Sequence, residues 1–178
     1  MTHSVVRYVA TARILHWITA ALVLTLIPVG LWMVYLEPAE EQAKLRLYNI
    51  HESLGVTVWV LALWRVVVRW RNPPPPLPPD LPAPIRLAAH ATHVLLYALL
   101  LTMPVIGFLG TNAWGFPLRW FGLVPIPSPV GADEALGAAL SLLHWWGALL
   151  IILLIGAHVA GALFHQFIRR DGLLARML

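Results

Sequence analysis

Long apolar stretches alternate with short polar ones along the whole chain. Four stretches, near residues 12–36, 48–70, 87–110 and 136–168, each reach or exceed the roughly 20 residues that a helix needs to cross a bilayer. Backbone groups in lipid must be hydrogen-bonded within their own segment, and these stretches predict helices rather than the strands of a barrel. The pattern therefore predicts an all-α fold, a transmembrane four-helix bundle.

Composition agrees with this class. Of the 178 residues, 60% are hydrophobic and only 11% are charged, which excludes a soluble domain of this size. The first stretch is longer than the apolar region of a signal peptide and lacks a clear small-residue cleavage site, so we retain it as a span. Eight of the fifteen prolines lie between Asn72 and Pro84 and predict an extended, semi-rigid connection. We see no internal repeat and expect residues 1–178 to form a single integral membrane domain.

Basic residues predict the orientation of the bundle. Nine of the twelve Lys and Arg residues lie near the chain termini or around the 72–84 connection, so both termini are expected to be cytoplasmic. Six of the eight acidic residues then lie on the outer side. The net charge of +4 thus reflects topology and not nucleic-acid binding. The nine are Arg7, Arg13, Arg65, Arg69, Arg71, Arg86, Arg169, Arg170 and Arg176, and the other three are Lys44, Arg46 and Arg119.

Histidines inside the apolar stretches point to chemistry. An unpaired polar ring in hydrocarbon is costly, so each such histidine predicts a partner. His144 and His158 are 14 residues apart in the fourth span, which puts them on nearly one helix face and about 21 Å apart along its axis. The expected topology places His51 at the depth of His144, and His16 near the cytoplasmic start of the first span.

Two residues of the fourth span compete as the partner of His16. Depth alone slightly favours His165, but that choice would stretch the separation from His144 to about 31 Å, the whole hydrocarbon thickness. His158 keeps both centres within the bundle, and the small residues around it leave room for a flat macrocycle. We therefore pair His16 with His158, and His51 with His144.

Two imidazoles at each level suit haem iron. Zinc or copper would need clustered ligands at about 2 Å each, and two per level are too few for a closed tetrahedral site. The chain has no cysteine, which excludes thiolate haem and covalent C-x-x-C-H attachment and leaves haem of the b type. Because two axial imidazoles fill both axial positions of the iron, the sequence predicts two haem b groups that perform outer-sphere electron transfer.

The chain resembles the bacterial cytochrome b561 family of four-helix di-haem membrane cytochromes. The resemblance rests on "RILHW" in the first span, "NIHESLGVTVWVLALWRVVVRWRNPPPP" through the second, "HATHVLLYALLLTMPVIG" in the third and "LHWWG…GAHVAGALFH" in the fourth. It implies that His16 and His158 ligate a cytoplasmic-side haem, and that His51 and His144 ligate an outer one. It also implies an electron path to or from ubiquinone in the bacterial inner membrane, and some members are superoxide oxidases.

We therefore expect electron transfer between an outer-side donor and the ubiquinone pool, with superoxide:ubiquinone oxidoreduction as the preferred activity. Lys44 and Arg46 are the candidates that steer superoxide to the outer haem, within an otherwise acidic surface. Candidates for quinone or propionate contacts lie near the cytoplasmic face, and an interface role without chemistry is an equal alternative for two of them, His90 and His93. These candidates are His90, His93, His165 and, for a propionate, Arg13.

Two other functions remain open at this point. The chain could be a haem-bearing membrane anchor that takes electrons from a soluble dehydrogenase or hydrogenase partner, although it lacks a large segment outside the membrane. It could also be a small transporter whose histidines relay protons or bind metal. The purified protein would then be colourless. The sequence leaves the physiological donor and the oligomeric state undetermined.

Overall fold

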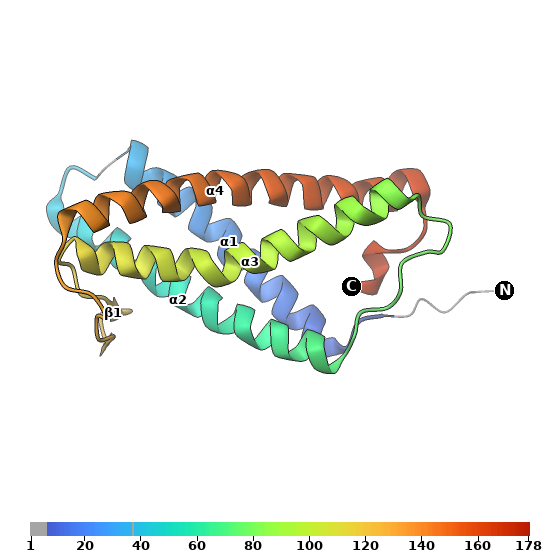
Figure 1. The fold of residues 1–178 in the computed structure, drawn as a ribbon, viewed down its shortest axis with the longest axis horizontal. Coiled ribbons are helices and arrows are strands. Elements are labelled where there is room, and N and C mark those ends of the chain that lie inside the picture. Colours follow the sequence, from blue (N-terminus) through green and yellow to red (C-terminus); the bar gives the residue numbers. More distant parts are fainter. Residues whose placement is uncertain (1–6, 37) are drawn as a thin grey trace.

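Four long helices run side by side in the computed structural model, which describes residues 7–36 and 38–178 (Figure 1). All four are long and apolar enough to cross a membrane. The predicted all-α, four-helix transmembrane bundle is therefore confirmed. The helices are α1 (Ala10–Tyr35), α2 (Glu41–Arg71), α3 (Ala83–Ala113) and α4 (Glu134–Leu163), and α4 continues as the π-helix η1 (Phe164–Arg169).

The helices extend beyond the predicted spans where they leave the apolar region. α2 begins at Glu41 rather than near residue 48, because its first two turns carry charged side chains that hydropathy excludes although the helix continues through them. α3 begins behind Pro82 with Pro84 in its first turn, where a missing N–H breaks no helical hydrogen bond. At the start of α4, the Asp133 side chain accepts a hydrogen bond from the Leu136 N–H at 3.0 Å, as an N-cap residue does.

The four helices pack in the order α1, α2, α3, α4. α1 packs on α2, α2 on α3 and α3 on α4, whereas within the described residues α4 makes no comparable backbone contact with α1 or α2. Glycines let α3 and α4 approach closely. A Cβ on Gly137 would lie 3.0 Å from the Trp114 ring, and one on Gly147 would overlap Met103 Sδ. α4 is thus held by α3 and meets α1 and α2 only through side chains.

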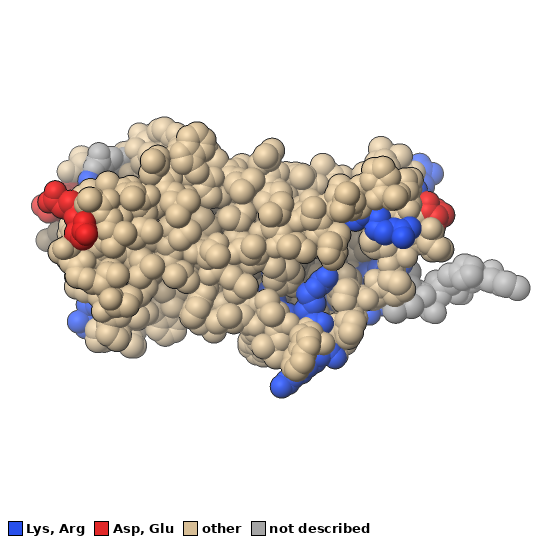
Figure 2. All heavy atoms as spheres, viewed as in Figure 1, with Lys and Arg blue, Asp and Glu red and all other residues tan. Residues whose placement is uncertain are grey.

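The two ends of the bundle differ in charge. Both ends of the described chain and the α2–α3 connection lie together (Figure 1). We call this the basic end, because the nine arginines grouped above belong to it. The opposite, acidic end carries the α1–α2 and α3–α4 connections with Glu40, Glu41, Asp133 and Glu134. On the face shown in Figure 2, most blue side chains lie toward the basic end and the larger red group marks the acidic end.

The C-terminal segment, residues 170–178, closes the basic end. It folds back after η1 and contains one turn of 3-10 helix, η2 (Leu174–Arg176). The Trp17 Nε1–H of α1 donates to the Met177 carbonyl at 2.9 Å. The Arg176 guanidinium donates to the Pro76 carbonyl, in the α2–α3 connection, at 2.7 Å. The segment therefore ties α1 and this connection to the end of α4.

Hydropathy does not reveal a small hairpin at the acidic end. β1 (Arg119–Trp120) pairs antiparallel with β2 (Val124–Pro125), and Phe121 follows β1 with a positive φ of 49°. The hairpin packs on α2, where fully buried Ser53 accepts a hydrogen bond from the Phe121 N–H at 2.7 Å. This bond holds Phe121 in a backbone conformation that residues other than glycine seldom adopt.

Replacing Ser53 with Ala is expected to destabilise the protein by about 0.5–1.5 kcal/mol, because the Phe121 N–H then loses its partner at a part-buried position. Thermal unfolding of the purified protein in detergent measures the change, and hydrogen exchange locates it in the hairpin. Thr102→Val is the matched control, since its exposed hydroxyl bonds only to the Ala98 carbonyl of its own helix. Equal melting temperatures for the two variants would show that this bond does not hold the hairpin.

Candidate haem sites

The four predicted ligand histidines meet in two pairs at two levels of the bundle. His16 of α1 lies against His158 of α4, with ring centroids 6.1 Å apart and ring planes at 64°. His51 of α2 lies against His144 of α4, at 6.3 Å and 71°. α4 contributes one ring to each pair. The rings thus meet across the interface where α4 lacks backbone packing on α1 and α2.

The spacing within each pair suits one metal ion between two imidazoles. An imidazole nitrogen binds a metal at about 2 Å, and the ring adds roughly 1 Å from nitrogen to centroid, so two axial rings place their centroids about 6 Å apart. Within the described residues, no three or more His, Asp or Glu side chains gather into a metal-binding cluster. Two ligands per level match the axial positions of haem iron and not a closed zinc site.

Hydrogen bonding does not account for the pair at the acidic end. Nδ1 of His51 and Nδ1 of His144 are both buried, and neither has a hydrogen-bond partner in the described part of the chain. Buried polar atoms without partners are rare. The two rings are therefore not a simple interhelical hydrogen-bonded pair.

Glycines shape the space around the rings. A Cβ on Gly30 of α1 would lie 3.1 Å from Cε1 of His51, and one on Gly107 of α3 would lie 3.0 Å from Cε1 of His144. These glycines let α1 and α3 approach a ring edge. Other glycines near the pairs border open space, where a Cβ would meet nothing within 4 Å; they are Gly55, Gly156 and Gly161. The surroundings fit a flat macrocycle held between α4 and its neighbours.

The pair at the basic end has cationic neighbours. Arg65 of α2 places Nη2 3.2 Å from Nδ1 of His16, and because a guanidinium only donates, Nδ1 accepts this bond. The same guanidinium stands over the Tyr97 ring at 5.2 Å, and Arg69 lies over that ring at 5.7 Å. Two guanidinium groups beside the rings suit an anionic group such as a haem propionate.

The predicted histidines of α3 lie in two different places. The His93 ring is 5.2 Å from the His158 ring, and Nδ1 of His93 bonds to the Ala89 carbonyl at 2.7 Å. His90 is exposed and borders a groove of about 600 Å³ that also includes Arg86 and residues of the α2–α3 connection. Within the described residues, these two side chains neither hydrogen-bond to nor stack on His165. The structure therefore does not bring the three quinone candidates into direct contact.

His165 is the most buried of the candidate histidines. It lies in η1, and its Nδ1 is 2.6 Å from Oδ2 of Asp171 in the C-terminal segment. Phe164 packs edge-on against its ring at 5.6 Å. π-helical turns are rare and often mark functional sites.

The three candidate cations differ in their surroundings. Arg13 donates a hydrogen bond to the Leu178 carbonyl, so the C-terminal segment engages it. Lys44 is half-buried beside a hollow of about 560 Å³ at the acidic end. It lies seven residues before His51 and so on nearly the same face of α2. Arg46, five residues before His51, is exposed on another face.

In the sequence, Arg65 is most simply a topology charge with a propionate contact as the alternative, and neither Asp171 nor Gly107 stands out. Arg65 follows His51 by 14 residues, the spacing that also separates His144 from His158, and this signal could have placed it on the ligand face. The contacts of Asp171 and Gly107 depend on how separate segments meet, and no local sequence pattern predicts them.

A profile of the prokaryotic cytochrome b561 family matches residues 7–178. The chain is 34% identical over 178 residues to cytochrome b561 homolog 2 of Escherichia coli (strain K12), which covers 99% of this chain and 94% of that protein. It is 29% identical over 179 residues to cytochrome b561 homolog 1 of the same organism, with 97% of each covered. It is 32% identical over 130 residues to the probable superoxide oxidase CybB of Yersinia pestis, covering 72% of this chain and 73% of that protein.

Gly107→Ala is expected to displace the His144 ring, because the new Cβ would lie 3.0 Å from its Cε1. The result should be lower haem content or a shifted visible spectrum in the purified protein, measured by the pyridine haemochrome assay and by absorption. Gly131→Ala is the control, in the α3–α4 connection outside the helices that carry the ring pairs, where the Cβ also meets open space. Native content and spectra in both variants would mean that α3 does not constrain this ring.

Proposed function

The chain belongs to the prokaryotic cytochrome b561 family, and on this premise we propose that it passes single electrons from superoxide, outside the bacterial inner membrane, to ubiquinone. Family membership makes it a transmembrane electron-transfer protein with b-type haem. The observation that carries the proposal is the meeting of four histidine rings as two pairs at two levels of one bundle. Two redox centres in series suit transfer across a membrane.

Each pair is proposed to hold one haem b through its two imidazoles. When bound, haem supplies reversible one-electron chemistry, and two protein ligands leave no axial position for oxygen. Ligation through Nε2 leaves the proton of His16 on Nδ1, which then cannot accept the bond from Arg65. We therefore expect Arg65 to change its partner when haem is bound, and a propionate is the anion that suits it.

The charge asymmetry of the bundle supports the direction of transfer. The basic end carries nine arginines, so the positive-inside rule places it at the cytoplasmic face. His16 and His158 are then the cytoplasmic-side ligands, and His51 and His144 are the outer ones. This orientation puts the superoxide side at the acidic end and the quinone side near the C-terminal segment.

Lys44 supports superoxide as the donor. It shares a face of α2 with His51 and borders the hollow at the acidic end. A cation at such a position attracts a small anion even where the surrounding surface is acidic, because charges farther away than about 10 Å are largely screened at 0.1 M salt. A relative at 32% identity carries the name probable superoxide oxidase, which agrees with this donor.

His165 supports quinone reduction at the basic end. Its ring is buried, and one nitrogen is occupied by Asp171, so Nε2 is the atom that remains to bond with a ligand. A quinone carbonyl accepts hydrogen bonds, and Nε2 can donate one when the ring is protonated on both nitrogens. His93, whose ring lies against His158, is a second candidate contact at this depth.

Single histidine substitutions test the haem assignment. His144→Ala is expected to lose mainly the outer haem and His16→Ala mainly the inner one, because each removes one axial ligand of one site. Haem-to-protein ratios and low-temperature spectra measure the losses. His165→Ala should keep both haems. The pairing is wrong if either ligand variant retains two low-spin bis-histidine haems.

Charge reversal tests the donor. Lys44→Glu is expected to slow haem reduction by superoxide roughly 3- to 10-fold at low salt, because the steering cation becomes an anion. The rate of the native protein should also fall as salt rises. Arg46→Glu makes the same charge change on another face of α2 and should have a smaller effect. A slow rate that ignores salt and both reversals would point to a protein partner as donor.

A further inference from the structure

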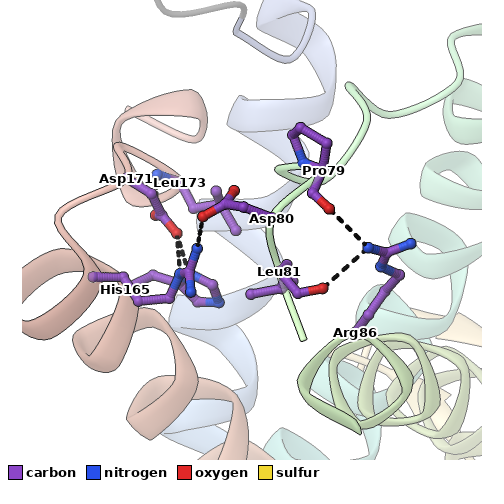
Figure 3. Close-up of polar contacts among 8 residues, drawn as sticks. Pro79, Asp80, Leu81, Arg86, His165, Asp171 and Leu173 are labelled. Atoms are coloured by element: carbon purple, nitrogen blue, oxygen red, sulfur yellow. Dashed lines mark hydrogen bonds and ion pairs between the residues drawn. The ribbon is translucent and has the colours of Figure 1, made fainter. Parts of the chain in front are cut away.

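Four side chains at the basic end form a chain of ionic hydrogen bonds (Figure 3). Nδ1 of His165 lies 2.6 Å from Oδ2 of Asp171. The same Oδ2 accepts a hydrogen bond from Nε of Arg169 at 3.1 Å, and Nη2 of Arg169 reaches Oδ2 of Asp80 at 2.6 Å. These residues come from η1, the C-terminal segment and the α2–α3 connection. No other ion pairs link side chains in residues 7–36 and 38–178.

Burial increases along this chain from Asp80 to His165. The Asp80 side chain is 72% exposed and that of Arg169 is 19% exposed. The Asp171 side chain is 13% exposed, and that of His165 is 8% exposed. The histidine is thus the innermost member, and Asp171 lies between it and the polar surface.

The charge of Asp171 determines the tautomer of His165. Partial burial would raise the pKa of Asp171, but hydrogen bonds from the His165 ring and the Arg169 guanidinium outweigh it and hold this pKa below its usual value. The carboxylate is therefore ionised at neutral pH and can only accept hydrogen bonds. The proton on the short bond must then belong to Nδ1 of His165, which leaves Nε2 to exchange a hydrogen bond or a proton with a ligand.

The backbone also holds Asp171 against His165. η1 widens the last turn of the helix from α to π geometry, and Arg170 follows it in the left-handed region with φ of 54°. The Asp171 N–H then bonds back to the His165 carbonyl at 3.4 Å, and its Oδ1 accepts from the Leu173 N–H at 3.3 Å. A π turn and a left-handed residue are both costly conformations. Together they turn the chain back so that the Asp171 carboxylate contacts the His165 ring.

We propose that Asp171 is a positioning residue for quinone reduction, which holds His165 with Nδ1 protonated so that Nε2 delivers a proton to a quinone oxygen. This inference rests on the proposed function, in which electrons reach a quinone at the basic end. Asp171 does not touch the quinone. It orients the ring and stabilises the positive charge that the ring carries before it gives up its proton, as a carboxylate does for a catalytic imidazole.

The step balances in electrons and protons. A quinone becomes a quinol by taking two electrons, which arrive singly through the proposed haems, and two protons. One proton comes from His165, where the Nε2–H bond breaks as an O–H bond forms. Water supplies the second proton at the other oxygen, and the ring is reprotonated from the cytoplasmic side. Other charged groups around this region are Arg169 and Asp80, with Arg13 of α1 and Arg176 of the C-terminal segment held on carbonyl oxygens.

Asp171→Asn tests the proposal, because it keeps the shape of the side chain and removes its charge. The variant is reduced with dithionite and mixed with a short-chain ubiquinone, and haem re-oxidation is followed from pH 5 to 9. We expect native haem spectra, re-oxidation slowed about 10-fold or more at neutral pH, and a falling limb of the pH profile displaced to lower pH. The displacement follows because the protonated ring loses its carboxylate. Asp171→Glu should largely restore the native profile.

Asp80→Asn is the matched control. It makes the same change on the other, exposed partner of Arg169 and should leave both the rate and the pH profile as in the native protein. If Asp171→Asn gives the native profile, or if Asp80→Asn moves the profile equally, Asp171 has no special role and the inference is overturned. A slower rate without any displacement of the profile also overturns it, since a structural defect alone would have that effect.

His165→Gln separates this inference from the proposed function. If it leaves quinone-dependent re-oxidation unchanged, the quinone is not reduced at His165 and the proposed site fails. If it slows re-oxidation while Asp171→Asn does not, the proposed site stands and the inference fails. Nitrogen NMR of labelled native protein tests the inference without an Asp171 variant. The neutral His165 ring, assigned by its absence in His165→Gln, should carry its proton on Nδ1, and a proton on Nε2 would overturn the proposal.

Discussion

Ring contacts relate α4 to the other half of the bundle. α4 packs on α3 through glycines, whereas His144 and His158 each face an imidazole of another helix, and Trp145 packs edge-on against Tyr35 of α1. A polar ring in hydrocarbon needs a partner, and at the acidic end the polypeptide offers none to the two Nδ1 atoms. In the proposed function, haem iron would be the partner of one nitrogen of each ring, and the open glycine faces beside the rings leave room for the macrocycle.

Much of the fold could be predicted because hydropathy measures the property that selects spanning helices. The four helices lie where the apolar stretches predicted them, and the errors fall at α2, whose first turns are helical but polar. The hairpin at the acidic end was missed because two short strands bury little and leave no periodic signal. Ser53, which holds that hairpin, looks in the sequence like any small residue of a span.

The candidate sites show the same division between local and long-range information. Helical spacing placed His144 and His158 on one face, and topology matched each with a partner at its depth; the structure puts the corresponding rings together, while their role as ligands stays a prediction. Arg65 carries the same kind of signal, since it follows His51 by 14 residues, but its contact with His16 depends on how α1 meets α2. Asp171 could not be assigned from spacing, because it reaches His165 only through the π-helix η1 and the left-handed Arg170.

In the proposed function, the 14-residue separation of His144 and His158 on α4 fixes the distance between the two haem levels. Both rings are attached to one continuous hydrogen-bonded rod, whose rise of about 1.5 Å per residue hardly changes under thermal motion. Movements of α1 or α2 within the membrane alter how well a ring is met from the opposite side, but they leave the distance between the two levels unchanged. Because tunnelling rates depend steeply on distance, electron transfer between two haems held at these levels would be little affected by such movements. Substitutions at the outer and inner faces can therefore accumulate without changing the distance between the two levels.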